Sequence, residues 1–162
     1  MFTEGNLDLE TGAIHVAVAN DGSKPPLLFL HGVTRRWQCF TPVFAALAPR
    51  WQLHAIDFRG HGESERRAGE YQVRDYVEDA VAYVRSRINR PVVIWGHSLG
   101  AMVAALAAAE LGDRVGAVVL EDPPLEAMGR RITESPLHHF FSVISAFAGD
   151  QRPVAEVARD LG

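Results

Sequence analysis

The sequence has little cysteine, no long apolar run and no basic leader. Cys39 is its single cysteine, so an intrachain disulfide is excluded, which is typical of a reducing compartment. The most apolar run, Ala101–Ala109, is too short and too rich in alanine to span a bilayer. Residues 1–10 lack the basic-then-apolar order of a signal peptide. These features predict a cytoplasmic protein without a membrane span.

An excess of basic charge is also missing. The 162 residues carry a formal net charge of -4, and the arginine pairs at 35–36, 66–67 and 130–131 are isolated, so we expect no nucleic-acid partner. A metal site built from His31, Asp57 and His61 would lack the usual ligand spacing. We therefore expect neither a metal nor a cofactor.

The hydrophobic pattern predicts an α/β fold. Residues 7–10 and 14–18 alternate around Thr11–Gly12 and indicate an antiparallel hairpin. Apolar strand-like segments then alternate with helix-like ones; the strands are expected at 27–30, 51–58, 91–95 and 115–120, and the helices at 34–48, 73–88 and 99–111. This order predicts a mainly parallel sheet flanked by helices, with functional groups beyond the carboxyl ends of the strands.

The sequence Gly96-His97-Ser98-Leu99-Gly100 stands between a predicted strand and a predicted helix. Gly-x-Ser-x-Gly in this context is typical of a nucleophile elbow, a turn so tight that both glycine positions must be small. Ser98 would then lie at a helix N-terminus, where a developing anion is favoured. We therefore predict that Ser98 is a catalytic nucleophile.

Backbone donors for an oxyanion are expected from two places. One is the N–H of Leu99, the residue after the nucleophile, and the other is the N–H of Val33, after His31-Gly32 at the end of the strand 27–30. We interpret His31 as a residue that braces this loop. In the glycine-containing segment 57–64, Asp57, Arg59 and His61 are expected to pair and brace the neighbouring loop.

These three motifs, in this order, resemble the α/β-hydrolase superfamily. The similarity is greatest to its serine-nucleophile branch of esterases, C–C bond hydrolases and lactonases. The residue pattern of 125–162 indicates short helices at 142–147 and 154–161 without a further strand. The resemblance implies an α/β-hydrolase core over residues 1–124, the start of a helical cap over 125–162, and an acyl-enzyme formed on Ser98 from a small acyl substrate. It also implies that the last two strands and the usual acid and base lie beyond Gly162, and that an exposed sheet edge permits self-association.

Asp122 and His139 follow Ser98 in the order that this fold uses for its acid and its base. They are therefore the candidates for those two roles within the chain. Three interpretations stay open: part of a serine hydrolase, a non-catalytic binding or interaction module, and a short enzyme that borrows groups from a partner. A C–C bond hydrolase or an acyltransferase of the same fold would carry the same motifs.

Overall fold

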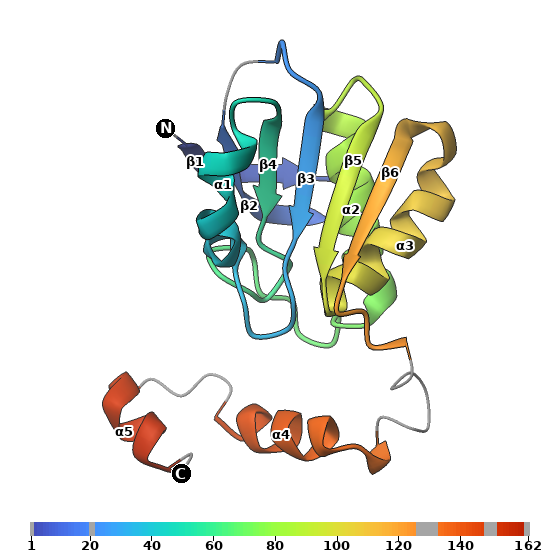
Figure 1. The fold of residues 1–162 in the computed structure, drawn as a ribbon. Helices are drawn as coiled ribbons and strands as arrows, with labels where there is room; N and C mark the ends of the chain where they lie inside the picture. Colours follow the sequence, from blue (N-terminus) through green and yellow to red (C-terminus); the bar gives the residue numbers. More distant parts are fainter. Residues whose placement is uncertain (1, 20–21, 126–132, 148–151, 161–162) are drawn as a thin grey trace. The chain divides into compact units, whose positions relative to one another are not determined.

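The chain forms two compact units, Met1–Pro123 and Pro124–Gly162, shown in Figure 1. The computed structural model describes residues 2–19, 22–125, 133–147 and 152–160. The arginine pair 130–131 and residue 161 of the expected last helix lie outside these ranges.

A six-stranded mixed sheet forms the first unit. Its strands are β1 (Phe2–Leu9), β2 (Gly12–Ala19), β3 (Pro26–Leu30), β4 (Gln52–Ile56), β5 (Val92–His97) and β6 (Val115–Glu121). In space they follow the order β1-β2-β4-β3-β5-β6. The hairpin β1–β2 adds to β4 in antiparallel fashion, whereas β4, β3, β5 and β6 are mutually parallel. The predicted hairpin and the mainly parallel sheet are confirmed.

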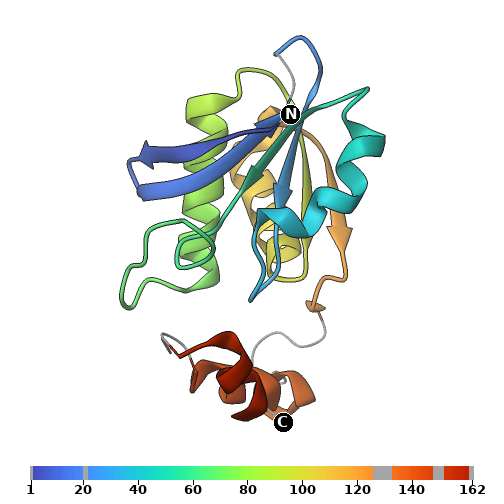
Figure 2. The same cartoon turned by 90° about the vertical axis from the view of Figure 1, so that its left-hand side faces the viewer.

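Helices cover both faces of this sheet (Figures 1 and 2). One face carries α2 (Val73–Arg87) and α3 (Leu99–Leu111), and the other carries the 3-10 turn η1 (Trp37–Phe40) and α1 (Thr41–Leu47). Helix α2 begins with a capping box between Gln72 and Asp75, which satisfies backbone donors at its first turn.

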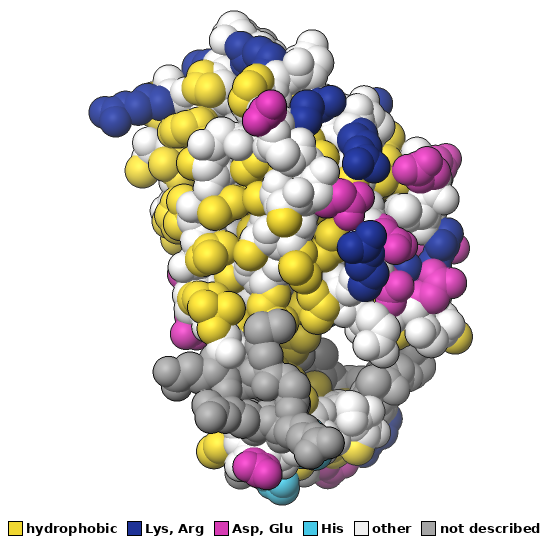
Figure 3. Space-filling view, turned by 90° about the vertical axis from the view of Figure 1, so that its right-hand side faces the viewer, with side chains coloured by type: hydrophobic (Ala, Val, Ile, Leu, Met, Phe, Trp, Pro, Cys, Tyr) yellow, Lys and Arg dark blue, Asp and Glu magenta, His cyan; other side chains and the backbone are white. Residues whose placement is uncertain are grey.

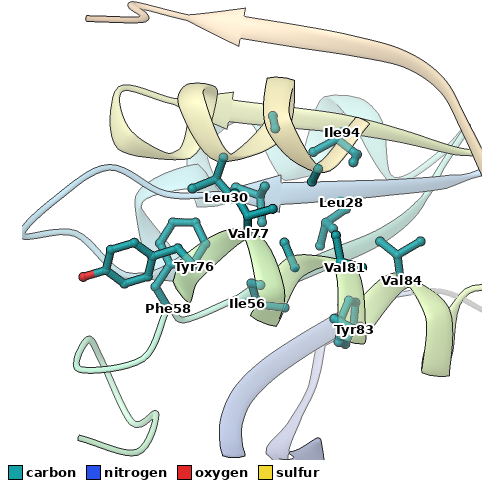
Figure 4. Packing of buried hydrophobic residues seen from close by; sticks show 14 of the residues in the cluster. Leu28, Leu30, Ile56, Phe58, Tyr76, Val77, Val81, Tyr83, Val84 and Ile94 are labelled. Atoms are coloured by element: carbon teal, nitrogen blue, oxygen red, sulfur yellow. The ribbon is translucent and has the colours of Figure 1, made fainter. Parts of the chain in front are cut away.

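The larger core cluster lies between α2, α3 and the sheet. Figure 4 shows Leu28, Leu30 and Ile94 from the strands facing Val77 and Val81 of α2. The helical residues recur every three or four positions, so that one stripe meets the sheet. The strand residues are buried, as expected for parallel strands covered by helices on both faces.

Several element boundaries differ from the sequence-based predictions, and strand β1 begins at Phe2 rather than at residue 7. The helix expected at 34–48 begins only at Trp37, because Thr34 has a φ of 62° and Arg36 is extended. Strand β5 continues through His97 rather than ending at residue 95. In the second unit, α4 spans Pro136–Ser145 instead of 142–147, because Ser135 caps its N-terminus.

Strand β6 is an edge of the sheet, and its hydrophobic side chains are exposed. Val118, Val119 and Leu120 keep 39%, 39% and 38% of their surface accessible. Figure 3 shows hydrophobic side chains gathered on this side of the molecule. An edge strand also has backbone N–H and C=O groups without a partner strand, so a strand of another chain could pair with β6.

The second unit contributes two helices to the described residues, α4 and α5 (Val154–Asp160). Phe140 of α4 is about half exposed. In the described ranges of both units, no helix combines the length and apolarity that crossing a membrane requires.

Candidate active site

Ser98 lies in a tight turn between β5 and α3. Its backbone has φ 52° and ψ −114°, a region that side-chain-bearing residues rarely occupy and that stores strain. Its N–H donates to the carbonyl of Glu121 at the end of β6 over 2.9 Å, and its carbonyl accepts from Ala101 N–H over 2.9 Å. The turn is thus held by the neighbouring strand and by the first turn of α3. Ser98 is partly exposed, so a ligand can reach it.

The two glycines of the motif are required by close backbone contacts. A Cβ on Gly96 would lie 2.0 Å from the carbonyl oxygen of Gly100, and one on Gly100 would lie 2.0 Å from the carbonyl oxygen of Leu30. Both obstacles are backbone atoms and cannot rotate away. The predicted steric need for glycine at positions 96 and 100 is confirmed, and the second contact sets α3 directly against the end of β3.

Residues 31–36 form the loop after β3, which we call the oxyanion loop. Gly32 lies against the elbow, because a Cβ there would be 2.7 Å from His97 Nδ1 and 3.2 Å from Ser98 Cβ. Val33 follows it directly, and Leu99 is the first residue of α3. The first N–H groups of an α-helix have no partner within the helix. Both predicted oxyanion donors therefore belong to segments that adjoin Ser98.

His31 is buried, and both of its ring nitrogens are hydrogen-bonded. Its Nε2 accepts from Phe58 N–H over 3.0 Å, so its proton resides on Nδ1, which donates to the carbonyl of Gly32 over 2.8 Å. Burial is the main cause that lowers the pKa of His31 to about 3. A neutral histidine with both nitrogens bonded is no general base for Ser98 in this geometry, and its contacts are those of a brace.

The segment 57–64 braces the site, but with partners other than those predicted. Asp57, Arg59 and His61 do not pair through their side chains. Arg59 instead pairs with Asp79 of α2 and with Glu70, and His61 Nδ1 contacts the carbonyl of Arg59. The expectation of mutual pairing was wrong, because α2 brings a buried carboxylate to Arg59 that the local sequence does not reveal.

Asp57 is buried and makes contacts that sequence reasoning missed. Its Oδ1 accepts from Trp37 N–H over 2.7 Å and its Oδ2 accepts from Glu63 N–H over 3.2 Å. His15 Nδ1 of β2 lies 3.3 Å from Oδ2. Its position directly after a strand marked Asp57 as a candidate functional residue. The sequence did not reveal its partners, because Trp37 and His15 come close to it only in the folded sheet.

The two candidates for acid and base lie in different units. Asp122 follows β6, one residue beyond the pairing of His97 with Glu121, and has a φ of 47°. It is exposed next to the strand end that holds Ser98 N–H. His139 is an exposed residue of α4 in the second unit.

A pocket of about 240 Å³ lies beside the elbow on the α1 face of the sheet, lined by Arg35, Cys39, Phe40, Val43, Trp95, His97 and Glu121. Trp95 Nε1 donates to Glu121 Oε2 over 2.9 Å and orients both side chains in its wall. Desolvation is the main cause that raises the pKa of Cys39 to about 11, so its thiol stays protonated near neutral pH. Side chains two residues apart in a strand point to the same face, so Trp95 and His97 of β5 both line this pocket. This shared face could have been predicted from the sequence.

Two curated relatives are similar to the chain in sequence. It is 31% identical over 153 residues to 2-(acetamidomethylene)succinate hydrolase of Mesorhizobium japonicum, covering 90% of this chain and 55% of that protein. It is 34% identical over 114 residues to pimeloyl-[acyl-carrier protein] methyl ester esterase of Xanthomonas oryzae pv. oryzae, covering 68% of this chain and 41% of the relative. The chain thus spans about half the length of these relatives.

A solved structure and a family profile agree with the geometry. The crystal structure of E-2-(acetamidomethylene)succinate hydrolase superposes with a TM-score of 0.69 at 32% identity, covering 83% of this chain and 52% of that one. Residues 25–153 match the profile of the alpha/beta hydrolase fold. This match covers most of the chain and includes the elbow, the oxyanion loop and the 57–64 segment, so the chain belongs to the alpha/beta hydrolase fold family.

Proposed function

We propose that the protein is a serine hydrolase that cleaves an ester or a related acyl substrate through an acyl-enzyme on Ser98. The observation that carries the proposal is the strained backbone of Ser98, with φ 52° at the junction of β5 and α3. Strain of this kind is kept where the surrounding structure enforces it, as the glycine contacts do here. This turn presents the hydroxyl beyond the carboxyl ends of the parallel strands, where a substrate carbonyl can approach.

The chemistry follows from the groups around Ser98. Its Oγ attacks the substrate carbonyl, and the hydroxyl proton passes to a general base and then to the leaving group. The negative charge on the carbonyl oxygen is stabilised by the N–H groups of Val33 and Leu99. Each such donor is worth about 3–4 kcal/mol of transition-state stabilisation. Water then hydrolyses the acyl-enzyme by the reverse path.

The names of two relatives support an acyl substrate. By these names, the two act on an acetamido compound and on a methyl ester, and both types of bond are open to attack at a carbonyl carbon. We propose a small-molecule acyl substrate for this protein and no cofactor, since the chemistry of Ser98 requires none.

The acid and base remain proposals. Asp122 is supported by its place directly after β6, whose last carbonyl accepts from Ser98 N–H. His139 is supported by chain order alone. We propose them as the candidates for acid and base within residues 1–162, and the second unit as the start of a helical cap.

Covalent labelling tests the nucleophile. The protein at its natural full length should react with a fluorophosphonate at Ser98, as located by peptide mass spectrometry, and Ser98→Ala should remove the label. His139→Ala and Asp122→Asn should each slow the labelling of Ser98 if these residues form the triad. A wild-type protein that stays unlabelled would overturn the serine-hydrolase assignment in favour of a non-catalytic binding module.

A further inference from the structure

The oxyanion loop is fastened at both ends by the carboxyl end of β4. At its start, His31 Nε2 accepts from Phe58 N–H over 3.0 Å. At its end, Asp57 Oδ1 accepts from the N–H of Trp37, the first residue of η1, over 2.7 Å. Between these two fixed points lies Val33, whose N–H is the donor assigned to the oxyanion.

Asp57 is itself held from several directions. Its backbone N–H donates to the carbonyl of His15 over 2.9 Å, and its backbone carbonyl accepts from Ser64 Oγ over 2.6 Å. The second carboxylate oxygen accepts from Glu63 N–H. A Cβ on Gly62 would lie 1.9 Å from that oxygen, so the loop closes around the carboxylate. The buried carboxylate thus has little freedom to move.

The oxyanion loop between His31 and Trp37 has a strained backbone, which the hydrogen bonds at its two ends hold in place. Thr34 has a φ of 62°, a conformation that is strained for a residue with a β-branched side chain. Arg35 N–H donates to the carbonyl of Gly32 over 3.1 Å and closes a turn around Val33. Gly32 is in contact range of Ser98, so a shift of the turn would move Val33 N–H relative to the nucleophile.

We propose that Asp57 is a positioning residue of the oxyanion hole, acting through its hydrogen bond to Trp37 N–H. It touches no substrate. It holds the end of the loop so that Val33 N–H stays aimed at the site where negative charge develops. This inference rests on the proposed function of Ser98.

The test compares Asp57→Ala, Asp57→Asn and a control that removes another carboxylate bonded to a backbone N–H, away from the oxyanion loop. Asp57→Ala removes both acceptors, whereas Asp57→Asn keeps one amide oxygen that can accept from Trp37 N–H. The control is Asp75→Ala, which removes the capping carboxylate at the start of α2, whose Oδ2 accepts from Gln72 N–H. All measurements are made well below the melting temperature of every variant.

The first readout is the second-order rate constant of fluorophosphonate labelling at Ser98, measured with the natural full-length protein. Loss of an oxyanion donor costs about 10²–10³-fold in rate, so displacement of Val33 in Asp57→Ala should cost about tenfold or more. Asp57→Asn should recover much of this loss, and Asp75→Ala should label at the wild-type rate. Equal rates in Asp57→Ala and wild type, or equal losses in Asp57→Ala and Asp75→Ala, would overturn the proposal. An equal loss in Asp57→Asn would overturn the role of the Trp37 hydrogen bond.

The second readout is amide hydrogen exchange across the oxyanion loop, which needs no reaction at Ser98. Asp57→Ala should speed exchange at residues 32–37 while α3 and β5 keep their protection. Unchanged exchange in the loop would contradict the positioning role. If wild type fails to label but the loop loosens in Asp57→Ala, the assigned chemistry is wrong and the fastening of the loop by Asp57 stands.

Discussion

Arg59 and Asp79 form a buried, bidentate ion pair between the segment 57–64 and α2. Arg59 Nε donates to Asp79 Oδ2 over 2.8 Å and Nη2 donates to Oδ1 over 2.7 Å. The hydrogen bond and charge of Asp79 raise the pKa of the Arg59 guanidinium, which therefore stays charged. The pair joins the loop beside the active site to a helix of the main core.

Breaking this pair should destabilise the protein strongly. In Asp79→Ala the buried, charged guanidinium of Arg59 would keep only the half-exposed Glu70 as an acidic partner. A buried charge without its buried partner lowers the free energy of unfolding by about 3–5 kcal/mol. Glu70→Ala removes the exposed partner of the same arginine and should cost less than about 1 kcal/mol. Urea unfolding measures both free energies, and similar losses for the two variants would contradict the dominance of the buried carboxylate.

Gly100→Ala should be costly although alanine favours helices. The added Cβ would lie 2.0 Å from the Leu30 carbonyl oxygen, so α3 must move away from β3, at a cost of about 3 kcal/mol, the upper end for overpacking. Gly5→Ala in β1 is the matched control, because its Cβ would meet nothing within 4 Å. Thermal unfolding should show a large loss for the first variant and little change for the second.

Ser98→Gly should make the protein more stable and remove its reactivity. Glycine occupies the region near φ 52° and ψ −114° without strain, and relief of that strain should outweigh the extra entropy of the unfolded chain by about 1 kcal/mol. Ser98→Ala also removes the hydroxyl but keeps a Cβ, so it should gain no such stability. If both variants unfold at the same urea concentration, the elbow is unstrained.

Acidification should destabilise the fold through buried histidines. Burial lowers the pKa of His31 to about 3 and that of His54 to about 4, whereas an exposed histidine titrates near 6.5. The unfolded chain therefore takes up these protons first, and stability present above pH 6.5 is lost as pH falls towards 4 and 3. For each proton that only the unfolded chain binds, the free energy of unfolding falls by about 1.4 kcal/mol per pH unit.

Histidine NMR signals measured between pH 7 and pH 5 check this directly. The ring resonances of His31 and His54 should stay those of neutral imidazole in the folded protein, and urea unfolding should show stability falling over the same range. His54→Gln, which can still bond to Tyr83 Oη across the 2.8 Å contact, should reduce the slope. A midpoint near 6.5 for either ring would contradict the expectation.

The edge of β6 should govern any self-association. Val119→Lys places a charge on the exposed edge strand and should lower the association constant measured by sedimentation velocity. Leu106→Lys on α3 is the control, since Leu106 is an exposed apolar residue outside the strands, with 48% of its surface accessible. Equal effects of the two variants would assign association to general hydrophobicity rather than to the strand edge.

Local sequence was sufficient for the elbow and for most of the elements. The glycine at 96 is dictated by the turn itself, because a Cβ there would collide with the backbone of Gly100. The three- and four-residue spacing of apolar side chains marked α2 as a helix. Such features depend on residues close in the chain, so their pattern can be read without knowledge of the fold. The helix start at Trp37 was missed because a contact with Asp57, twenty residues away, fixes it.

The sequence alone determined the α/β class, the tight turn at Ser98 and the places where functional loops leave the sheet. Only the tertiary structure decided that Arg59 binds Asp79, that Asp57 accepts from Trp37 N–H and that His31 Nε2 accepts from Phe58 N–H. These pairings join segments separated by 20 or more residues, and the crossovers that place strands side by side bring them together. A hydrogen bond requires atoms within about 3 Å, and spacing along the chain does not specify that distance.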